Sequence, residues 1–407
     1  MREIPPRVRE DLEFIPVMHE GKRYVLVRDH LGLVREGAAL PPELCQIMAF
    51  LDGKTPLSEL QGEMTRQNNG LFVTRMELDA VISQIDAAFL LESDNFQTAR
   101  DDIRAGFAAA RERPCSHCGQ VYPENPFELE KWLDAILKPR GGEETERTGS
   151  KVKGLIAPHI DPEAGARTYS RAYQAIRGQN PSRVVVLGVG HQLGDGLYSL
   201  SDKDFQTPLG VVENEPDIVR SLRQAGGDFT AKDDFAHRSE HSIEFQLLFL
   251  QRLLRPGSFT VIPILCGVCQ LFLQNYDRGS FLDLAGPFLK QIRRIVNQDD
   301  KPTLVVAGVD LSHVGPKFGH DRDAETLAPE ASDHDRSLLQ SLSLGDARGL
   351  WKESARVEDR YNVCGFTALA SLAEILPGAR GELLDYEVRH EPATASSVAF
   401  AAMVYQE

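Results

Sequence analysis

The sequence predicts an α/β protein with a large sheet and flanking helices, preceded by a small α+β domain of the winged-helix type. Three observations predict this. After residue 151, short Val/Ile-rich runs alternate with helical segments, the order expected of βαβ units. Those runs are mostly continuous rather than alternating, as in strands buried on both faces. The first 91 residues instead contain two strand-like segments followed by helical ones, so the 407 residues divide into at least two domains.

Residues 1–91 form the predicted small domain. "EFIPVMHEG" and "KRYVLVRD" are predicted to pair as a hairpin, and "PPELCQIMAFLDG" and "TPLSELQGEMTRQ" to form helices. A third helix is predicted to begin with a capping box, in which Thr74 and Glu77 exchange hydrogen bonds. Residues 92–114 are Ala- and Arg-rich and predict a linking helix, so the large domain is expected to span residues 115–407.

Composition excludes several classes of partner. The formal net charge is −15, and residues 41–91 carry more acidic than basic side chains, the wrong balance for binding nucleic acid or an anionic membrane surface. No apolar run reaches the length of about 18 residues that a membrane span needs. The N-terminus is charged and lacks the apolar core of a secretory signal, so we expect a cytoplasmic protein.

Histidines follow three of the predicted strands. His159 comes after "GLIAP", His191 after "RVVVLGVG", and Asp310 with His313 after "TLVVAG". In an open α/β sheet, ligands bind beyond the carboxyl ends of strands, so these side chains are expected to lie together. Each histidine taken alone is more simply explained as a hydrogen-bonded turn residue. Together they indicate a functional site.

Cys364 completes a candidate metal site. It precedes a predicted helix, where the helix dipole favours a thiolate. Imidazole and thiolate are good ligands for zinc, copper and iron, and a site with three protein ligands keeps a position open for catalysis. The sequence therefore predicts one mononuclear metal ion, and this ligand set leaves iron, copper and zinc open.

The segment "RSEHSIEFQLLFLQRLL" predicts a buried amphipathic helix. Ser239 is placed to cap it, and His241 and Glu244 lie close to one face. His241 is expected to reach the cleft as an acid or base, and Glu244 to line the metal site or the pocket. The alternative is a solvated helix start.

Four cysteines form two C-x-x-C pairs, Cys115 with Cys118 and Cys266 with Cys269. In a cytosolic protein this spacing favours metal or redox chemistry over a structural disulfide. One possibility is a shared structural Zn²⁺ bound by all four. The other is that each pair is packed without a ligand.

The order of these motifs resembles the Memo family, whose prokaryotic members are called AmmeMemoRadiSam system protein B. The resemblance covers residues 115–407 and rests on "APHIDP", "LGVGH", "TPLGVVE", "EHSIEFQLLFLQ", "GVDLSHVG" and "CGFTAL". It implies a fold similar to class III extradiol dioxygenases, which are non-haem Fe(II) enzymes, and so favours Fe²⁺ as the ion, with copper or zinc as alternatives. It also implies that His159, His191 and Cys364 bind the metal while Asp310, His313 and His241 line the same cleft as catalytic groups.

Asp161 departs from the family pattern. The family's segment after A-P-H is rich in Gly and aromatic residues, whereas this chain has "IDPEAGARTYSRAY". Asp161 is therefore an additional carboxylate that either joins the metal site, lines the pocket, or caps Arg167 or the next helix; a place in the pocket or behind the ligands is favoured.

The N-terminal segment resembles the PqqD-like family through "PRVREDLEFIPVMHEGKRYVLVRD" and "IMAFLDGKTPLSEL". In that family an extended peptide adds as a strand to the sheet edge. A structural cap on the larger domain is the equal alternative.

Three functions are consistent with the sequence. The first is an iron- or copper-dependent redox enzyme, dioxygenase-like, acting on a small molecule or a peptide. The second is a metal- or peptide-binding adaptor without turnover, and the third is a zinc hydrolase. The family name implies two partners, a radical-SAM protein and an AMMECR1-like protein.

Overall fold

The computed structural model describes residues 4–35, 37–67, 72–139, 151–298 and 301–407. The chain forms two compact units, residues 1–109 and 110–407. The predicted linking helix is α4, Asp94–Ala109, which belongs to the first unit. Among the helices of the described ranges, none is both long and apolar enough to cross a membrane.

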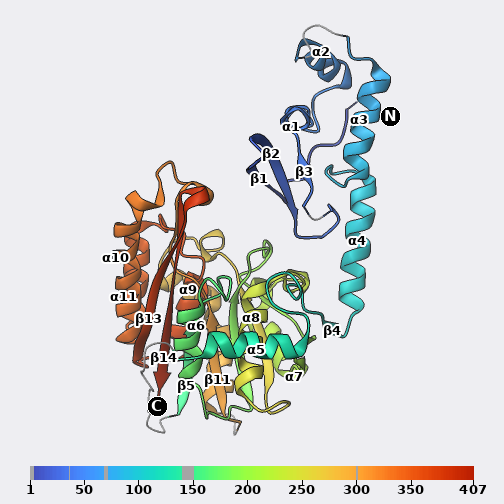
Figure 1. Ribbon diagram of the computed structural model, residues 1–407. Helices are drawn as coiled ribbons and strands as arrows, with labels where there is room; N and C mark the ends of the chain where they lie inside the picture. Colours follow the sequence, from blue (N-terminus) through green and yellow to red (C-terminus); the bar gives the residue numbers. More distant parts are fainter. Residues whose placement is uncertain (1–3, 36, 68–71, 140–150, 299–300) are drawn as a thin grey trace. The chain divides into compact units, whose positions relative to one another are not determined.

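The first unit contains the predicted hairpin and helices (Figure 1). Strands β1 and β2 pair antiparallel, and the short β3 pairs with β2. The capping box is present at the start of α3, where Thr74 accepts from the Glu77 backbone and Glu77 accepts from the Thr74 backbone. The elements before α4 are β1 Leu12–His19, β2 Lys22–Asp29, β3 Ala39–Leu40, α1 Pro42–Met48, α2 Leu57–Gln67 and α3 Arg75–Ala87.

The second unit is built on a mixed sheet of eight strands, counted over the part of the chain that the structure describes. Its centre is four parallel strands in the order β5-β11-β6-β10, which are the four Val/Ile-rich runs predicted before residue 310. The last predicted run is β14, which pairs antiparallel with β5. The strands are β5 Val152–Ala157, β6 Arg183–Val189, β7 Tyr198–Leu200, β10 Thr260–Cys266, β11 Thr303–Gly308, β12 His313–Val314, β13 Gly381–Glu391 and β14 Ser396–Gln406.

Helices cover both faces of this sheet (Figure 1). Strands β6 and β11 are buried along their whole length, and β5 and β10 are buried at all but one residue each. Side chains alternate between the two faces. Val185 and Leu187 pack with α9 (Arg278–Gln298) and α12 (Phe366–Ile375). Val184 and Val186 pack with α5 (Pro126–Leu137), α6 (Ala166–Gln174) and α8 (His241–Leu253). Burying a valine fully stabilises the fold by about 1.5–2 kcal/mol. This explains why the strands read as continuous apolar runs rather than alternating ones.

The remaining elements surround this core. A small sheet, β4-β8-β9, lies in the same unit. The elements are β4 Glu112–Arg113, α5 Pro126–Leu137, α6 Ala166–Gln174, β8 Asp204–Thr207, β9 Gly210–Val212, α7 Pro216–Gly226, α8 His241–Leu253, α9 Arg278–Gln298, α10 Ala324–Ser343, α11 Ala347–Val357 and α12 Phe366–Ile375.

Candidate metal centre

Three of the candidate site residues lie just beyond the carboxyl ends of three neighbouring parallel strands. His159 lies two residues beyond the end of β5, His191 two beyond β6, and Asp310 two beyond β11. Because β11 lies between β5 and β6 and all three run parallel, their carboxyl ends meet at one edge of the sheet. Cys364 reaches the same place from the loop that enters α12.

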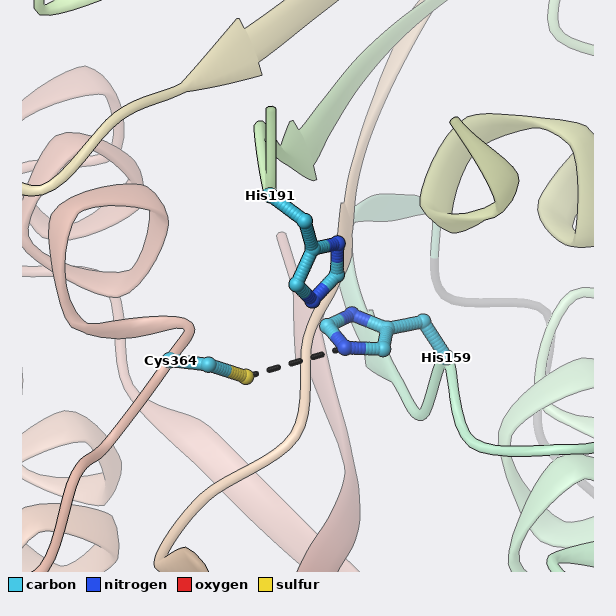
Figure 2. A group of neighbouring side chains, drawn as sticks. All are labelled: His159, His191 and Cys364. Carbon is cyan, nitrogen blue, oxygen red and sulfur yellow. Dashed lines mark hydrogen bonds between the residues drawn. The ribbon is translucent and has the colours of Figure 1, made fainter. Parts of the chain in front are cut away.

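His159, His191 and Cys364, here called the triad, bring their side chains together (Figure 2). Each offers one ligand atom, and these three atoms lie within 4.8 Å of one another. The Cys364 Sγ is 3.6 Å from His159 Nε2. Bond lengths of about 2.0–2.3 Å place two ligands of a tetrahedral metal site roughly 3.5 Å apart. The triad therefore has the spacing and the chemistry of a transition-metal site.

Hydrogen bonds fix the orientation of both triad histidines. His159 donates through Nδ1 to the Gly308 carbonyl, 3.0 Å away, and His191 donates through Nδ1 to the Glu240 carboxylate, 3.0–3.1 Å away. A carbonyl or carboxylate can only accept, so Nδ1 carries the proton in each ring. In its neutral form each ring then has a lone pair at Nε2 for a metal, the arrangement that protein metal sites use. A metal bound at His191 would displace the Nε2 proton that Glu240 favours.

Glu240 organises the histidine side of the triad. Its buried carboxylate accepts hydrogen bonds from the His191 backbone and ring, and from the backbone N–H groups of His241 and Ser242. The last two bonds make Glu240, not Ser239, the N-cap of α8, which corrects the sequence prediction. Burial alone would raise its pKa, but interaction with His191 and His241 and these bonds hold the pKa well below its usual value.

The electrostatics of the triad depend on burial and on Glu240. Burial and the neighbouring His191 lower the pKa of His159 to about 4. Burial would also lower the pKa of His191, but Glu240 outweighs it and raises that pKa well above the usual value. The predicted thiolate is not favoured at Cys364, because burial raises the pKa of the thiol more than His191 lowers it.

Asp310 lies beside His159, and His313 is close enough to interact electrostatically with His159 and His191. Asp310 Oδ1 accepts from the backbone N–H groups of His159 and Ile160, and its Oδ2 is 3.7 Å from His159 Nε2. Burial raises the pKa of Asp310 to about 6 and lowers that of His313. His313 Nδ1 donates to the Leu311 carbonyl, so its Nε2 also has a free lone pair.

His241 also packs against the triad. Its ring stacks on His191 with centroids 5.0 Å apart and meets His159 edge-on at 5.2 Å. His191, Glu240 and His241 form a second group of possible metal ligands. Glu240 already accepts four N–H groups, so the triad is the better candidate of the two groups. Burial lowers the pKa of His241 to about 3, which keeps the ring neutral.

Glu244 and Asp161 lie outside the triad and make other contacts. The buried Glu244 carboxylate forms an ion pair with Arg113, and burial alone would raise its pKa while Arg113 and His117 lower it. Asp161 is exposed, and its Oδ1 accepts from the backbone of Glu163 and Ala164. Asp161 is in neither group of possible ligands found among the described residues, so it forms the turn before α6.

The structure does not form the shared zinc site suggested for the two C-x-x-C pairs. Cys115 and Cys118 are joined by a disulfide, whereas Cys266 and Cys269 are free, buried thiols. The two pairs also pack against opposite faces of the sheet, in different core clusters. Four ligands on opposite sides of a buried sheet cannot reach one ion.

Sequence reasoning missed two residues of the site. Glu240 precedes His241 in "RSEHS", and its carboxylate at a helix start was a usable signal for capping. His117 lies between Cys115 and Cys118, and its ring meets that of His241 at 5.6 Å. Its position depends on contacts between residues more than 120 apart in sequence, so no local pattern indicates it.

Comparisons with known proteins agree with the motifs. The family described as Memo-like protein matches residues 113–404. A MEMO1 family protein of Aquifex aeolicus is 31% identical over 405 residues, covering 98% of this chain and 99% of the relative. A MEMO1 family protein of Thermus thermophilus is 28% identical and covers 87% of this chain and all of the relative. A relative from Methanopyrus kandleri, 29% identical, covers 72% of this chain with 99% of its own length.

Proposed function

Because this chain belongs to the Memo-like protein family, we propose that its triad binds one transition-metal ion and that the protein is a metal-dependent oxidoreductase. The observation that carries the proposal is the convergence of two Nε2 lone pairs and one sulfur, with both rings oriented from behind by Gly308 and Glu240. Ordinary turn histidines have no reason to share that arrangement.

The ligand set favours iron or copper. Two imidazoles and one thiol give a mixed nitrogen–sulfur set that accepts iron, copper or zinc, and three protein ligands leave at least one position open. A bound iron or copper ion would supply one-electron chemistry for oxidising a small-molecule or peptide substrate.

Three further residues support this role through their contacts. Asp310 accepts the backbone N–H groups of His159 and Ile160 and so fixes the loop that carries the first ligand. His313 offers a lone pair at Nε2, through which it would take up a proton from substrate. His241 stacks on His191 and so covers one face of that ring.

Metal content tests the proposal. The full-length protein, purified anaerobically and analysed for metals, should carry about one iron or copper ion per chain. His191→Ala should lose the ion, because a site with two remaining ligands binds weakly. His390→Ala is the matched control, since His390 is exposed on β13, and it should keep the ion.

The outcomes separate the parts of the proposal. A His191→Ala protein that retained its metal would refute the ligand assignment. Metal binding without oxygen consumption, in the presence of peptide or small-molecule extracts, would reject the oxidoreductase while leaving metal binding intact. Zinc as the retained ion, with hydrolysis of amides or esters, would reject redox chemistry.

A further inference from the structure

The loop of residues 113–122 carries the Cys115–Cys118 disulfide and His117, whose ring contacts His241. Nothing in the proposed metal chemistry uses the disulfide. Both cysteines are half-buried, so part of each remains accessible from solvent. The disulfide closes a ring around only two intervening residues. Because stabilisation by a cross-link grows with loop length, this short ring contributes little to the fold.

Glu244 holds the same loop without help from the disulfide. Its carboxylate accepts the backbone N–H groups of Ser116 and His117 at 3.0–3.2 Å, the Ser116 hydroxyl at 2.9 Å, and the Tyr122 hydroxyl. Arg113 adds an ion pair to Glu244 and donates to the Ser116 hydroxyl. Breaking the S–S bond therefore leaves the loop in place, with the two sulfurs close enough to rejoin.

The second C-x-x-C pair provides a contrast within the same chain. Cys266 and Cys269 have the same spacing, but they are 2% and 0% exposed and remain free thiols. Burial raises the pKa of Cys266 strongly and that of Cys269 to about 12, so neither forms the thiolate that exchange requires. Spacing alone does not make a reactive pair. Accessibility distinguishes the first pair from the second.

We propose that Cys115 and Cys118 form a redox-active site that undergoes thiol–disulfide exchange with a dithiol reductant. A thiolate of the reductant attacks one sulfur of the pair, the S–S bond breaks, and a mixed disulfide forms while the other cysteine takes up a proton. The second thiol of the reductant then attacks the mixed disulfide. Cys115 and Cys118 leave as two thiols, the reductant becomes a disulfide, and two electrons and two protons have been transferred.

The site adjoins the histidines, although its chemistry does not depend on a metal. His117 lies between the two cysteines, and its ring contacts His241 and Phe245 edge-on with centroids 5.6 Å apart in each case. His241 in turn packs on both triad histidines. A change in the redox state of the pair would therefore act on the triad histidines through the contacts of the His117 and His241 rings.

A redox titration tests the proposal independently of metal binding. The full-length protein is equilibrated with mixtures of reduced and oxidised dithiothreitol in the presence of a chelator, then quenched and alkylated. Peptide mass spectrometry should show Cys115 and Cys118 gaining and losing label together in one reversible two-electron transition, without loss of near-ultraviolet circular dichroism. Cys266 and Cys269 should stay unlabelled until denaturant is added.

Single variants supply the controls. Cys115→Ser should abolish the transition and leave Cys118 labelled at every dithiothreitol ratio, whereas Cys266→Ser should leave the transition unchanged. The proposal is overturned if both thiols stay alkylatable in excess oxidised dithiothreitol. It is equally overturned if the disulfide is reduced only after the protein has been unfolded.

Discussion

The two sides of the triad are held in different ways. On the histidine side, His159 and His191 stand immediately beyond buried parallel strands, and each ring is fixed by a hydrogen bond at Nδ1. On the cysteine side, Cys364 follows a loop, residues 358–363, in which Glu358, Asp359 and Asn362 have positive φ. Non-glycine residues rarely adopt that conformation, so surrounding contacts must maintain it.

Each C-x-x-C segment supports one side. The segment of Cys115 places His117 against His241 on the histidine side. On the cysteine side, the Cys269 backbone N–H donates to the Thr367 hydroxyl at the start of α12, and Gln270 Nε2 donates to Asp359 Oδ2 at 2.8 Å. The segment on the histidine side holds a half-buried disulfide, whereas the segment on the cysteine side holds two buried free thiols, so thiol–disulfide exchange is proposed for the first segment alone.

The two histidines are therefore preorganised by the sheet, whereas the cysteine depends on a loop under conformational strain. Changes on the histidine side should cost more stability and more metal affinity than changes on the cysteine side.

Replacing Glu240 with alanine should have the largest effect. The change removes the acceptor of four N–H groups and leaves them buried without a partner. Breaking a buried charged interaction of this kind typically costs about 3–5 kcal/mol. Loss of a group that orients a metal ligand lowers affinity about 10–100-fold. Urea unfolding followed by tryptophan fluorescence measures the first effect, and metal titration measures the second.

The control for this prediction is Glu325→Ala. Glu325 is an exposed carboxylate in the first turn of α10, so it matches Glu240 in its place near a helix start but not in its buried contacts. We expect a change below about 0.5 kcal/mol. Equal losses in the two variants would contradict the role given to Glu240.

The sequence predicted the sheet and the strand-end histidines because both depend on local patterns. Continuous Val/Ile runs identify buried strands, and the geometry of parallel sheets brings residues such as His159 and His191 together. The sheet order and the antiparallel pairing of β14 depend on contacts between distant segments, so the order of elements along the chain does not determine them.

The supporting groups were harder to predict. Glu244 was expected in the site but pairs with Arg113, 131 residues away. Asp161 was expected near the pocket, but its side chain satisfies two backbone N–H groups of its own turn. A carboxylate next to a predicted ligand is as useful to a turn as to a metal, and the sequence alone does not separate these uses.

Replacing Asn362 with alanine tests the cysteine side and should have a smaller effect. Asn362 has φ of 49°, and its side chain donates to the carbonyls of His313 and Phe318 at 3.3 and 3.1 Å. Alanine loses both bonds and tolerates positive φ poorly, so we expect a loss of about 2 kcal/mol. The same urea experiment measures it.

Asn362→Gly separates the two causes, because glycine removes the side-chain bonds but accepts positive φ. It should be more stable than the alanine variant by about 1 kcal/mol. Metal affinity should fall less in either variant than in Glu240→Ala. If Asn362→Ala bound metal more weakly than Glu240→Ala, the cysteine side would matter more for metal affinity than the histidine side, contrary to the proposal.

The smallest effect is a difference in pH dependence between the two sides. The Glu244 pKa is lowered: burial opposes this, but Arg113 and His117 outweigh it. Glu244 therefore contributes stability that is present above its unfolded pKa of about 4.5 and lost as pH falls through the lower folded value.

Burial raises the pKa of Asp359 to about 6, from 3.8. Its contribution has the opposite sign: the unfolding free energy falls as pH rises from about 4 to about 6.

Variants of these two residues should change different parts of the pH profile. In Asp359→Asn, the fall of the unfolding free energy between about pH 4 and 6 should become smaller, by an amount of order 1 kcal/mol. In Glu244→Gln, the loss of unfolding free energy below about pH 4.5 should become smaller. Both tryptophans, Trp132 and Trp351, lie in the second unit, so their fluorescence in urea at each pH reports on the unit that contains both groups. Both substitutions also remove hydrogen bonds and so change the absolute free energy of unfolding. The variants are therefore compared by the slope of the unfolding free energy against pH. An Asp359→Asn profile as steep as the wild type between pH 4 and 6 would show that this carboxyl group is not held neutral by burial.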